Sequence, residues 1–132
     1  MPAQTALRIL IADDNVDAAD SLTALLELEG HFVVTAYDGQ QGLDAALSSP
    51  FDLAILDLAM PHLDGYGLGR FLRDLNPETT LVALSGHATA QHKARTRAEG
   101  FHHHLAKPGD PADLQAIISA VQRKVGHATA SG

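Results

Sequence analysis

Apolar residues along the chain follow two alternating patterns. Five short runs of apolar or β-branched residues are typical of strands buried on both faces, and they lie at 7–12, 32–36, 53–56, 81–85 and, more weakly, 102–106. Apolar residues recur at helical spacing in the longer stretches between these runs. The inner stripes predicted for the helices are Leu22, Leu25 and Leu26; Leu43, Ala46 and Leu47; Leu68, Phe71, Leu72 and Leu75; and Leu114, Ile117, Ile118, Val121 and Val125.

Turn and cap residues mark where these segments begin and end. Asn15 or Asp14 is placed to cap the first helix, and Gly30 is placed to end it. A polar and weaker helix is predicted for 89–99. Pro111 suits the first position of the last helix, where its missing N–H has no partner to lose.

The result is five consecutive strand–helix units. Units of this size imply right-handed crossovers, so the pattern predicts an α/β fold in which helices cover both faces of a parallel sheet. The chain of 132 residues has no linker or composition break, which favours one domain. We expect this domain at 7–125, after a short extension at 1–6 and before a flexible tail at 126–132 that has nothing to bury.

Composition narrows the class of protein. Sixteen acidic residues against nine basic ones give a net charge of −7, which argues against direct binding to nucleic acid. The chain has no cysteine, so it has neither disulfides nor a thiolate zinc site. No apolar run approaches the roughly 20 residues needed to span a bilayer, and no leader peptide is evident. We therefore expect a soluble, cytoplasmic domain with no membrane partner.

Chemically active residues follow four of the five predicted strands. Asp13 and Asp14 end the first strand, Asp57 the third, Ser85 the fourth, and Lys107 the fifth. Ligands of open parallel sheets bind beyond the carboxyl ends of the strands. Three carboxylates, one hydroxyl and one amine are therefore predicted to meet at one edge of the sheet.

Charge indicates what such a group of residues can do. Three carboxylates repel one another, and Mg²⁺ relieves this repulsion because it prefers hard oxygen ligands. We predict a Mg²⁺ site formed by the three acids with the backbone carbonyl of Ala59; with Lys107 the charges then sum to zero. Asp57, the single acid of the central strand, is the candidate nucleophile toward phosphorus, because carboxylates form aspartyl phosphates. Lys107 and Ser85 would then stabilise the phosphoryl oxygens.

With these motifs the chain resembles the receiver domain of bacterial two-component signalling. The resemblance covers 7–125 and rests on "ILIADDN", "AILDLAMPHLDGYG", "ALSG" and "HLAKPGD". It implies a flavodoxin-like, three-layer fold with five helices and strand order 2-1-3-4-5. It also implies that Asp57 accepts phosphate, in the presence of Mg²⁺, from the phosphohistidine of a sensor kinase or a phosphotransfer protein. Asp13 and Asp14 match the family's metal-binding acids, Ser85 its hydroxyl position, and Lys107 its lysine.

The resemblance also implies details around this site. Pro108 matches a family position with a cis peptide bond, and the loop at 60–65 shapes the pocket. The switch position, usually Tyr or Phe, is His104 here, and we expect its ring to rotate into space that Ser85 leaves on phosphorylation. Ala59 replaces a polar residue that helps to position the hydrolytic water, which predicts slow self-dephosphorylation. The chain is thus expected to be a switch rather than an enzyme, signalling to a downstream protein by contact or by onward phosphotransfer.

Two other functions fit parts of the pattern. Phosphohydrolases of the haloacid-dehalogenase type also use a strand-end aspartate, but they need a second acid where this chain has Ala59. A flavin-binding module of the same fold needs a phosphate loop after the first strand, where the acidic pair would repel phosphate. The histidine run at 102–104 offers a weaker zinc hypothesis, since only His102 and His104 share a face of a strand.

Overall fold

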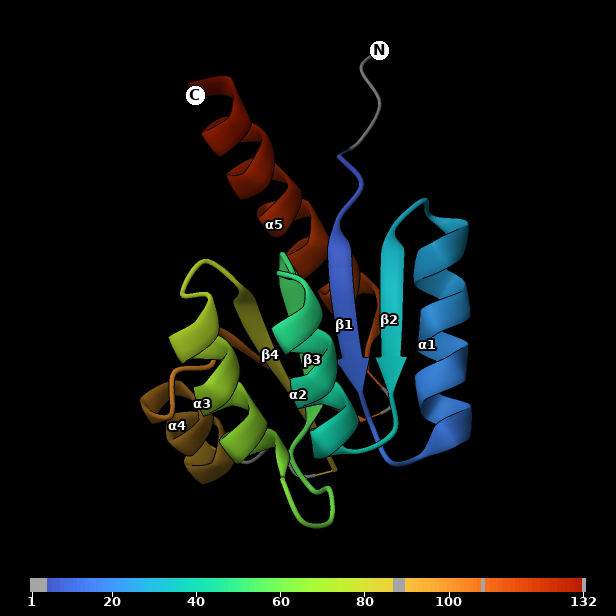
Figure 1. Ribbon diagram of the computed structural model, residues 1–132, viewed down its shortest axis with the longest axis vertical. Helices are drawn as coiled ribbons and strands as arrows, with labels where there is room; N and C mark the ends of the chain where they lie inside the picture. The colour runs from blue at the N-terminus through green and yellow to red at the C-terminus, as the bar shows by residue number, and fades with distance from the viewer. Residues whose placement is uncertain (1–4, 87–89, 108, 132) are drawn as a thin grey trace.

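The computed structural model describes residues 5–86, 90–107 and 109–131. Within these ranges five strands alternate with five helices (Figure 1). The elements are β1 (Arg8–Ala12), α1 (Val16–Leu28), β2 (Phe32–Ala36), α2 (Gly39–Ser48), β3 (Leu53–Asp57), α3 (Gly65–Leu75), β4 (Thr80–Ser85), α4 (Ala90–Ala98), β5 (His103–Ala106) and α5 (Pro111–Ser131). Every strand predicted from the apolar runs is present, with its ends shifted by at most one residue.

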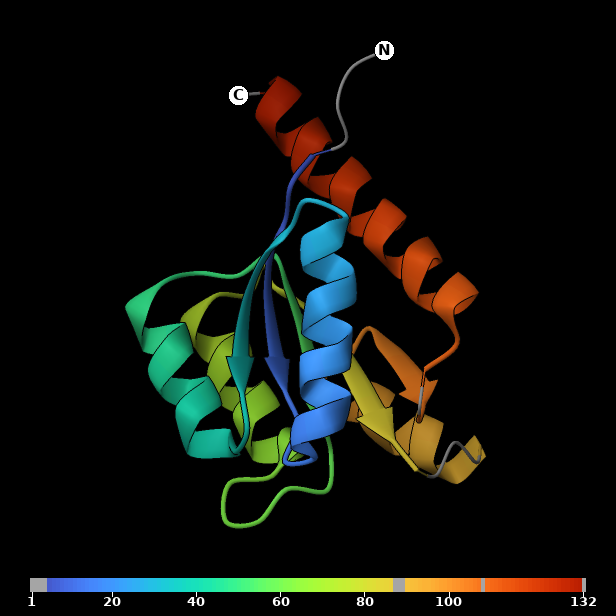
Figure 2. The same ribbon diagram turned by 90° about the vertical axis from the view of Figure 1, so that its right-hand side faces the viewer.

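The strands form one parallel sheet in the order β2-β1-β3-β4-β5. Helices α1 and α5 cover one face of it, while α2 and α3 cover the other and α4 lies against β5 (Figures 1 and 2). The predicted flavodoxin-like architecture and strand order are therefore confirmed. Because β1 and β3 are neighbours in this order, the acids that follow them end at the same edge of the sheet.

Alternation along the strands builds a separate core on each face of the sheet. Ile9, Ile11 and Ile55 point toward α1 and α5. Leu10 and Leu56, one position along their strands, point toward α2 and α3. Successive side chains of a strand lie on opposite faces, so a strand that is buried on both sides must be apolar throughout. This requirement explains why β3 is buried over its whole length, including the carboxylate at its end.

The inner stripes of three helices differ from those predicted. The side chains that are exposed instead of buried are Leu25, Leu47, Phe71 and Leu75. On α2 and α3, glycines lie at close contacts: a Cβ on Gly42 would lie 2.7 Å from Cδ2 of Leu68, and one on Gly69 would lie 2.9 Å from the Phe101 ring. The pattern of large apolar residues missed these positions because glycine carries no hydrophobic signal.

The helix ends follow the predicted signals, except at the C-terminus. The Asn15 side chain caps α1 by accepting a hydrogen bond from the N–H of Ala18 at 3.1 Å. Gly30 and Gly100 have positive φ angles of 95° and 98° after α1 and α4. Helix α5, however, continues to Ser131 through the segment that we predicted to be a flexible tail. Extending a helix that has already formed avoids the cost of nucleation, so further residues can join its end.

The start of α3 is packed directly against the end of β3. A Cβ at Gly65 would lie 2.4 Å from the carbonyl oxygen of Asp57 and 2.8 Å from Cα of Leu58, which are both backbone atoms. We expect Gly65→Ala to lower the free energy of unfolding by about 1–3 kcal/mol relative to Gly67→Ala, as overpacking usually does. Gly67 is a matched control because it lies in the same helical turn, and its new Cβ would meet the movable end of the Leu63 side chain. Equal urea-unfolding stabilities of the two variants would contradict this constraint.

Candidate functional site

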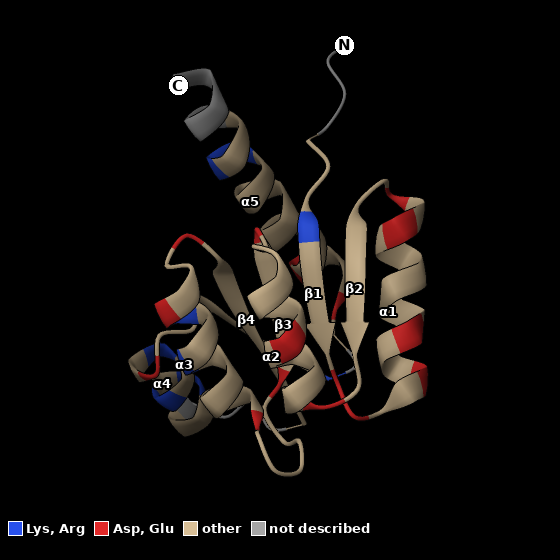
Figure 3. Ribbon diagram, in the orientation of Figure 1, with Lys and Arg blue, Asp and Glu red and all other residues tan. Residues whose placement is uncertain are grey.

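The three acids at the sheet edge form a compact group, which we call the acid cluster: Asp13, Asp14 and Asp57. One ligand oxygen from each lies within 4.8 Å of the other two. Asp13 and Asp57 are only 1% and 2% exposed, whereas Asp14 faces solvent. Figure 3 shows acidic residues in the loop between β1 and α1, at the same end of the sheet as the end of β3. The sequence prediction that these strand ends converge is therefore consistent with the observed geometry.

Backbone hydrogen bonds fix the directions of the two buried carboxylates. Asp13 Oδ1 accepts from the N–H of Asn15 at 2.9 Å, and Asp57 Oδ1 accepts from the N–H of Ala59 at 3.0 Å. Each acid therefore binds the turn that follows its own strand. In Asp57 this arrangement leaves Oδ2 for a partner from another strand.

That partner is Lys107, which follows β5. Its Nζ donates to Asp57 Oδ2 at 3.0 Å and to Asp13 Oδ1 at 3.2 Å. Burial by itself lowers the pKa of Lys107, but the hydrogen bonds to Asp57 and Asp13 outweigh it, so that this pKa is raised. The amine therefore stays charged at neutral pH. It links the first, third and fifth strands across the mouth of the site.

The electrostatic balance leaves Asp57 easy to protonate. The pKa of Asp57 is raised from 3.8 to about 6: burial is the largest cause and the neighbouring Asp13 adds to it, while the hydrogen bonds from Ala59 and Lys107 act in the opposite direction. With all three acids ionised and Lys107 charged, the group carries −2. Binding of a cation or of a proton therefore stabilises the site.

A shallow hollow opens above Asp57. Its volume is about 530 Å³. The residues that line it are Asp14, Asn15, Asp57, Ala59, Gly86 and Lys107. Four of these six residues carry polar or charged side chains, and the hollow has room for an ion together with its bound waters.

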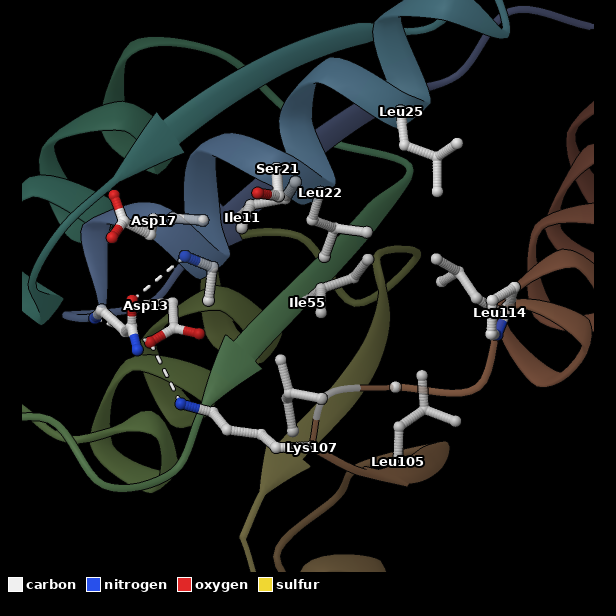
Figure 4. Close-up of a pocket in the computed structure, with 16 residues that line it drawn as sticks. Ile11, Asp13, Asp17, Ser21, Leu22, Leu25, Ile55, Leu105, Lys107 and Leu114 are labelled. Atoms are coloured by element: carbon white, nitrogen blue, oxygen red, sulfur yellow. Dashed lines mark hydrogen bonds and ion pairs between the residues drawn. The ribbon is translucent and has the colours of Figure 1, made fainter.

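A second, larger cavity adjoins the acid cluster. It has a volume of about 730 Å³ and lies between α1 and α5, with apolar walls that include Leu22, Leu25 and Leu114 (Figure 4). Asp13 and Lys107 stand at its polar end and also hold the acid cluster together. Leu25, which is exposed instead of buried, is one of the walls of this cavity.

Ser85 and His104 are in direct contact. Ser85 is the last residue of β4 and is buried, and its Oγ lies 2.8 Å from Nε2 of His104. On the other side of the ring, Nδ1 lies 3.2 Å from Oγ1 of Thr96 on α4. The ring is thus already beside Ser85, and its expected rotation on phosphorylation stays a prediction. The role of Thr96 could not be read from the sequence, because a single threonine in a polar helix carries no motif.

The histidine run does not form a metal site in the part of the chain that the structure describes. His102 Nδ1 accepts the N–H of Leu81 at 2.9 Å and so supports the start of β4. His104 has the separate contacts given above. Among the described residues, the acid cluster is where three potential metal ligands come together. The predicted cis peptide at Pro108 lies outside the described residues.

The acid cluster fits a hard divalent cation. Its donors are carboxylate oxygens, one of them is solvent-facing, and the hollow leaves room for coordinated water. None of the described helices is both long and apolar enough to cross a bilayer.

Comparison with known proteins gives a consistent result. A family model described as the response regulator receiver domain matches residues 9–119. The cell cycle transcriptional regulator CtrA of Caulobacter vibrioides is 32% identical over 123 residues, which are 92% of this chain and 53% of that protein. The chain spans about half the length of the curated relatives it matches.

Two solved structures resemble the whole domain. A response regulator protein from Burkholderia pseudomallei, solved with a phosphorylated aspartic acid, a calcium ion and citrate, has a TM-score of 0.78 at 27% identity and covers 93% of this chain and 72% of that one. The receiver domain of sensor histidine kinase PA1611 from Pseudomonas aeruginosa, solved with a magnesium ion in its active site cleft, has a TM-score of 0.79 at 28% identity and covers 89% and 98%. Since the family model matches most of the chain and the fold agrees with it, the chain belongs to the response regulator receiver domain family.

Proposed function

We propose that the chain is a phosphorylation switch in which Asp57 accepts a phosphoryl group from the phosphohistidine of a sensor histidine kinase or a phosphotransfer protein. The observation that carries this proposal is the position of Asp57, buried at the end of the central strand, hydrogen-bonded to Lys107 and open to a polar hollow. The phosphorylated aspartic acid in the related Burkholderia structure supports it.

In this proposal Mg²⁺ is held by the acid cluster and by the backbone carbonyl of Ala59. The magnesium ion in the related Pseudomonas receiver domain supports this choice of metal. When bound, the ion would neutralise the net charge left by the acids and Lys107, and it would attract the oxygens of the incoming phosphoryl group. Three carboxylates, one amine and one Mg²⁺ sum to zero, so the nucleophile can be ionised at neutral pH despite its raised pKa.

The transfer is a simple exchange of bonds at phosphorus. A carboxylate oxygen of Asp57 forms the new O–P bond while the N–P bond of the donor histidine breaks, and the electron pair stays on the imidazole nitrogen. Lys107 is placed to donate hydrogen bonds to the phosphoryl oxygens, since its Nζ is 3.0 Å from Asp57 Oδ2. Ser85 then donates its hydroxyl hydrogen to the phosphoryl group, because hydrogen bonds to a charged acceptor are the strong ones.

Output then depends on the change around Ser85 and His104. We propose that the chain signals through contacts with a downstream protein or through onward phosphotransfer, in the cytoplasm and without direct contact with nucleic acid or a membrane. The relative from Caulobacter is a transcriptional regulator about twice as long as the matched region, and that whole-protein activity is not transferred to this chain. The switch itself turns over no substrate beyond its own phosphoryl group.

The phosphoacceptor assignment is tested with a small acyl-phosphate donor and Mg²⁺. We expect the intact protein to gain the mass of one phosphoryl group and Asp57→Asn to gain none, because an amide is not a nucleophile here. Asp74→Asn is the matched control, since Asp74 is an exposed aspartate on α3. A variant at Asp57 that gains the same mass at the same rate would overturn the assignment.

The raised pKa of Asp57 predicts a particular pH dependence of stability. Between pH 3.8 and about 6 the folded chain holds a proton on Asp57 that the unfolded chain has lost. The free energy of unfolding of the metal-free protein therefore falls as the pH rises through this window, by roughly 2–3 kcal/mol in total from this group. Asp57→Asn should lack this loss, and Mg²⁺ should stabilise the intact protein more at neutral pH than at pH 5.

Urea unfolding over a pH series, with EDTA or with Mg²⁺, measures both effects. A stability difference between the intact protein and Asp57→Asn that does not change with pH would show that Asp57 is not perturbed in this way. A Mg²⁺ effect that does not depend on the acid cluster would count against the metal site.

Ala59 is expected to give the phosphorylated state a long lifetime. Its methyl side chain offers no polar group to hold a water molecule in line for attack on phosphorus. Ala59→Asn should therefore speed the decay of phosphorylated protein several-fold, whereas Ala59→Val, which adds bulk without a polar group, should not. Decay is followed by mass spectrometry after the donor is removed, and equal rates in all three proteins would show that this position does not set the lifetime.

A further inference from the structure

A chain of hydrogen bonds connects helix α4 with the site. Thr96 on α4 contacts the ring of His104 on β5, which contacts the Ser85 hydroxyl at the end of β4. Thr96 is 2% exposed, so its hydroxyl is buried inside the contact between α4 and the sheet. These contacts determine which atom donates in each hydrogen bond of the series from Thr96 through His104 to Ser85.

The direction is set at Thr96. Its hydroxyl has one hydrogen, and it donates this hydrogen to the carbonyl oxygen of Lys93 at 2.9 Å. Oγ1 must therefore accept from Nδ1 of His104, which means that Nδ1 carries a hydrogen. A neutral imidazole with a hydrogen on Nδ1 has an acceptor at Nε2. Ser85 must then donate its own hydrogen to Nε2, across 2.8 Å.

This arrangement conflicts with a phosphoryl group on Asp57. Phosphoryl oxygens only accept hydrogen bonds, and the one hydroxyl hydrogen of Ser85 cannot serve both His104 and the phosphoryl group. If Ser85 turned its hydrogen to the phosphoryl group, two acceptor lone pairs would face each other between Oγ and Nε2. The conflict ends when Nε2 gains a proton, because the imidazolium then donates to Ser85 while Ser85 donates to phosphate.

We propose that Thr96 and His104 are positioning residues for the phosphoryl site, and that His104 takes up one proton from solvent when Asp57 is phosphorylated. Thr96 fixes the tautomer of the ring, and the ring fixes the direction of the Ser85 hydroxyl. This inference rests on the proposed function of Asp57. The proton has a route, because His104 is half-buried and lines a surface hollow of about 200 Å³.

The charges that face the ring favour this sequence of events. Lys93 and Arg97 of α4 line the same hollow, and the flanking His102 and His103 belong to its own strand segment. Burial lowers the pKa of His102 and of His103, so both are neutral near pH 7. The two α4 cations oppose a proton on His104 in the unphosphorylated chain. A phosphoryl dianion on the Ser85 side supplies the opposite charge.

The test observes the ring nitrogens of His104 directly. Histidine-labelled protein is titrated by ¹⁵N NMR, with and without beryllofluoride and Mg²⁺ as the phosphoryl mimic, and the signals are assigned by their loss in His104→Ala. We expect the Nδ1–H tautomer in the free protein and a midpoint of ring titration at least one pH unit higher with the mimic. By linkage, the mimic then binds about tenfold more tightly at low pH than at high pH as a result of this ring.

Two matched variants separate positioning from structure. Thr96→Val keeps the shape of the side chain but removes the acceptor for Nδ1–H, so it should abolish the tautomer preference and reduce the shift. Thr96→Ser keeps the hydroxyl, so it should retain both the Nδ1–H tautomer and the full shift of the titration midpoint. Amide spectra check that each variant is folded, and the tautomer of the intact protein tests the inference even if Thr96→Val unfolds.

The outcomes distinguish this inference from the proposed function. If the mimic binds at Asp57 but the ring has the Nε2–H tautomer, or titrates at the same pH with and without the mimic, the inference is wrong and the phosphoacceptor role stands. If the mimic does not bind, both the phosphoacceptor role of Asp57 and the inference about His104 are wrong. If the midpoint of His104 titration shifts equally in Thr96→Val and in the intact protein, Thr96 does not position the ring.

Discussion

The bridge that Lys107 makes between Asp13 and Asp57 holds the site together. Two carboxylates that are almost fully buried would repel each other, and the amine lies 3.2 Å and 3.0 Å from them. Breaking a buried pair by removing one partner is costly, because it leaves an uncompensated charge. The same contact ties together strands β1, β3 and β5, which come from three distant parts of the chain. The site thus depends on the whole sheet, and the sheet edge in turn is held by the charges of the site.

A second constraint is how closely the backbone is packed around Asp57. Gly65 lets the first turn of α3 approach the Asp57 carbonyl, and the N–H of Leu58 donates to the carbonyl of Leu84 on β4 at 3.0 Å. Asp57 therefore stands on backbone that cannot shift without moving its neighbours. Preorganisation of this kind places a reacting group at no further cost when the reaction occurs. The hollow above it, in contrast, is open to the surface.

The strands were predictable from patterns that repeat along the sequence. Features that depend on contacts between distant elements were not predictable in this way. Strand positions, their order by resemblance, and the convergence of Asp13, Asp57 and Lys107 followed from short apolar runs that end in charged residues. The predicted inner faces of the helices were only partly correct; on α2 and α3, Gly42 and Gly69 lie at close contacts and carry no hydrophobic signal. The extent of α5 was missed because propagation of a helix does not require a buried face. Thr96 was missed because its importance arises from one hydrogen bond to His104 across two elements.

In the proposed mechanism the two ends of the site would respond to pH in opposite directions, and together they would define the pH range in which the switch works. At Asp57, phosphoryl transfer needs the ionised carboxylate, so a pKa of about 6 disfavours the reaction at lower pH until a cation relieves the acid cluster. At His104, proton uptake on phosphorylation favours the phosphorylated state as the pH falls. A metal that lowers the pKa of Asp57 would extend this pH range to lower pH without changing the protonation of His104. In this mechanism Mg²⁺ would set the lower pH limit of the switch and the hydrogen bonds of Ser85, His104 and Thr96 would set the upper limit, so substitutions on different strands would change the two limits independently.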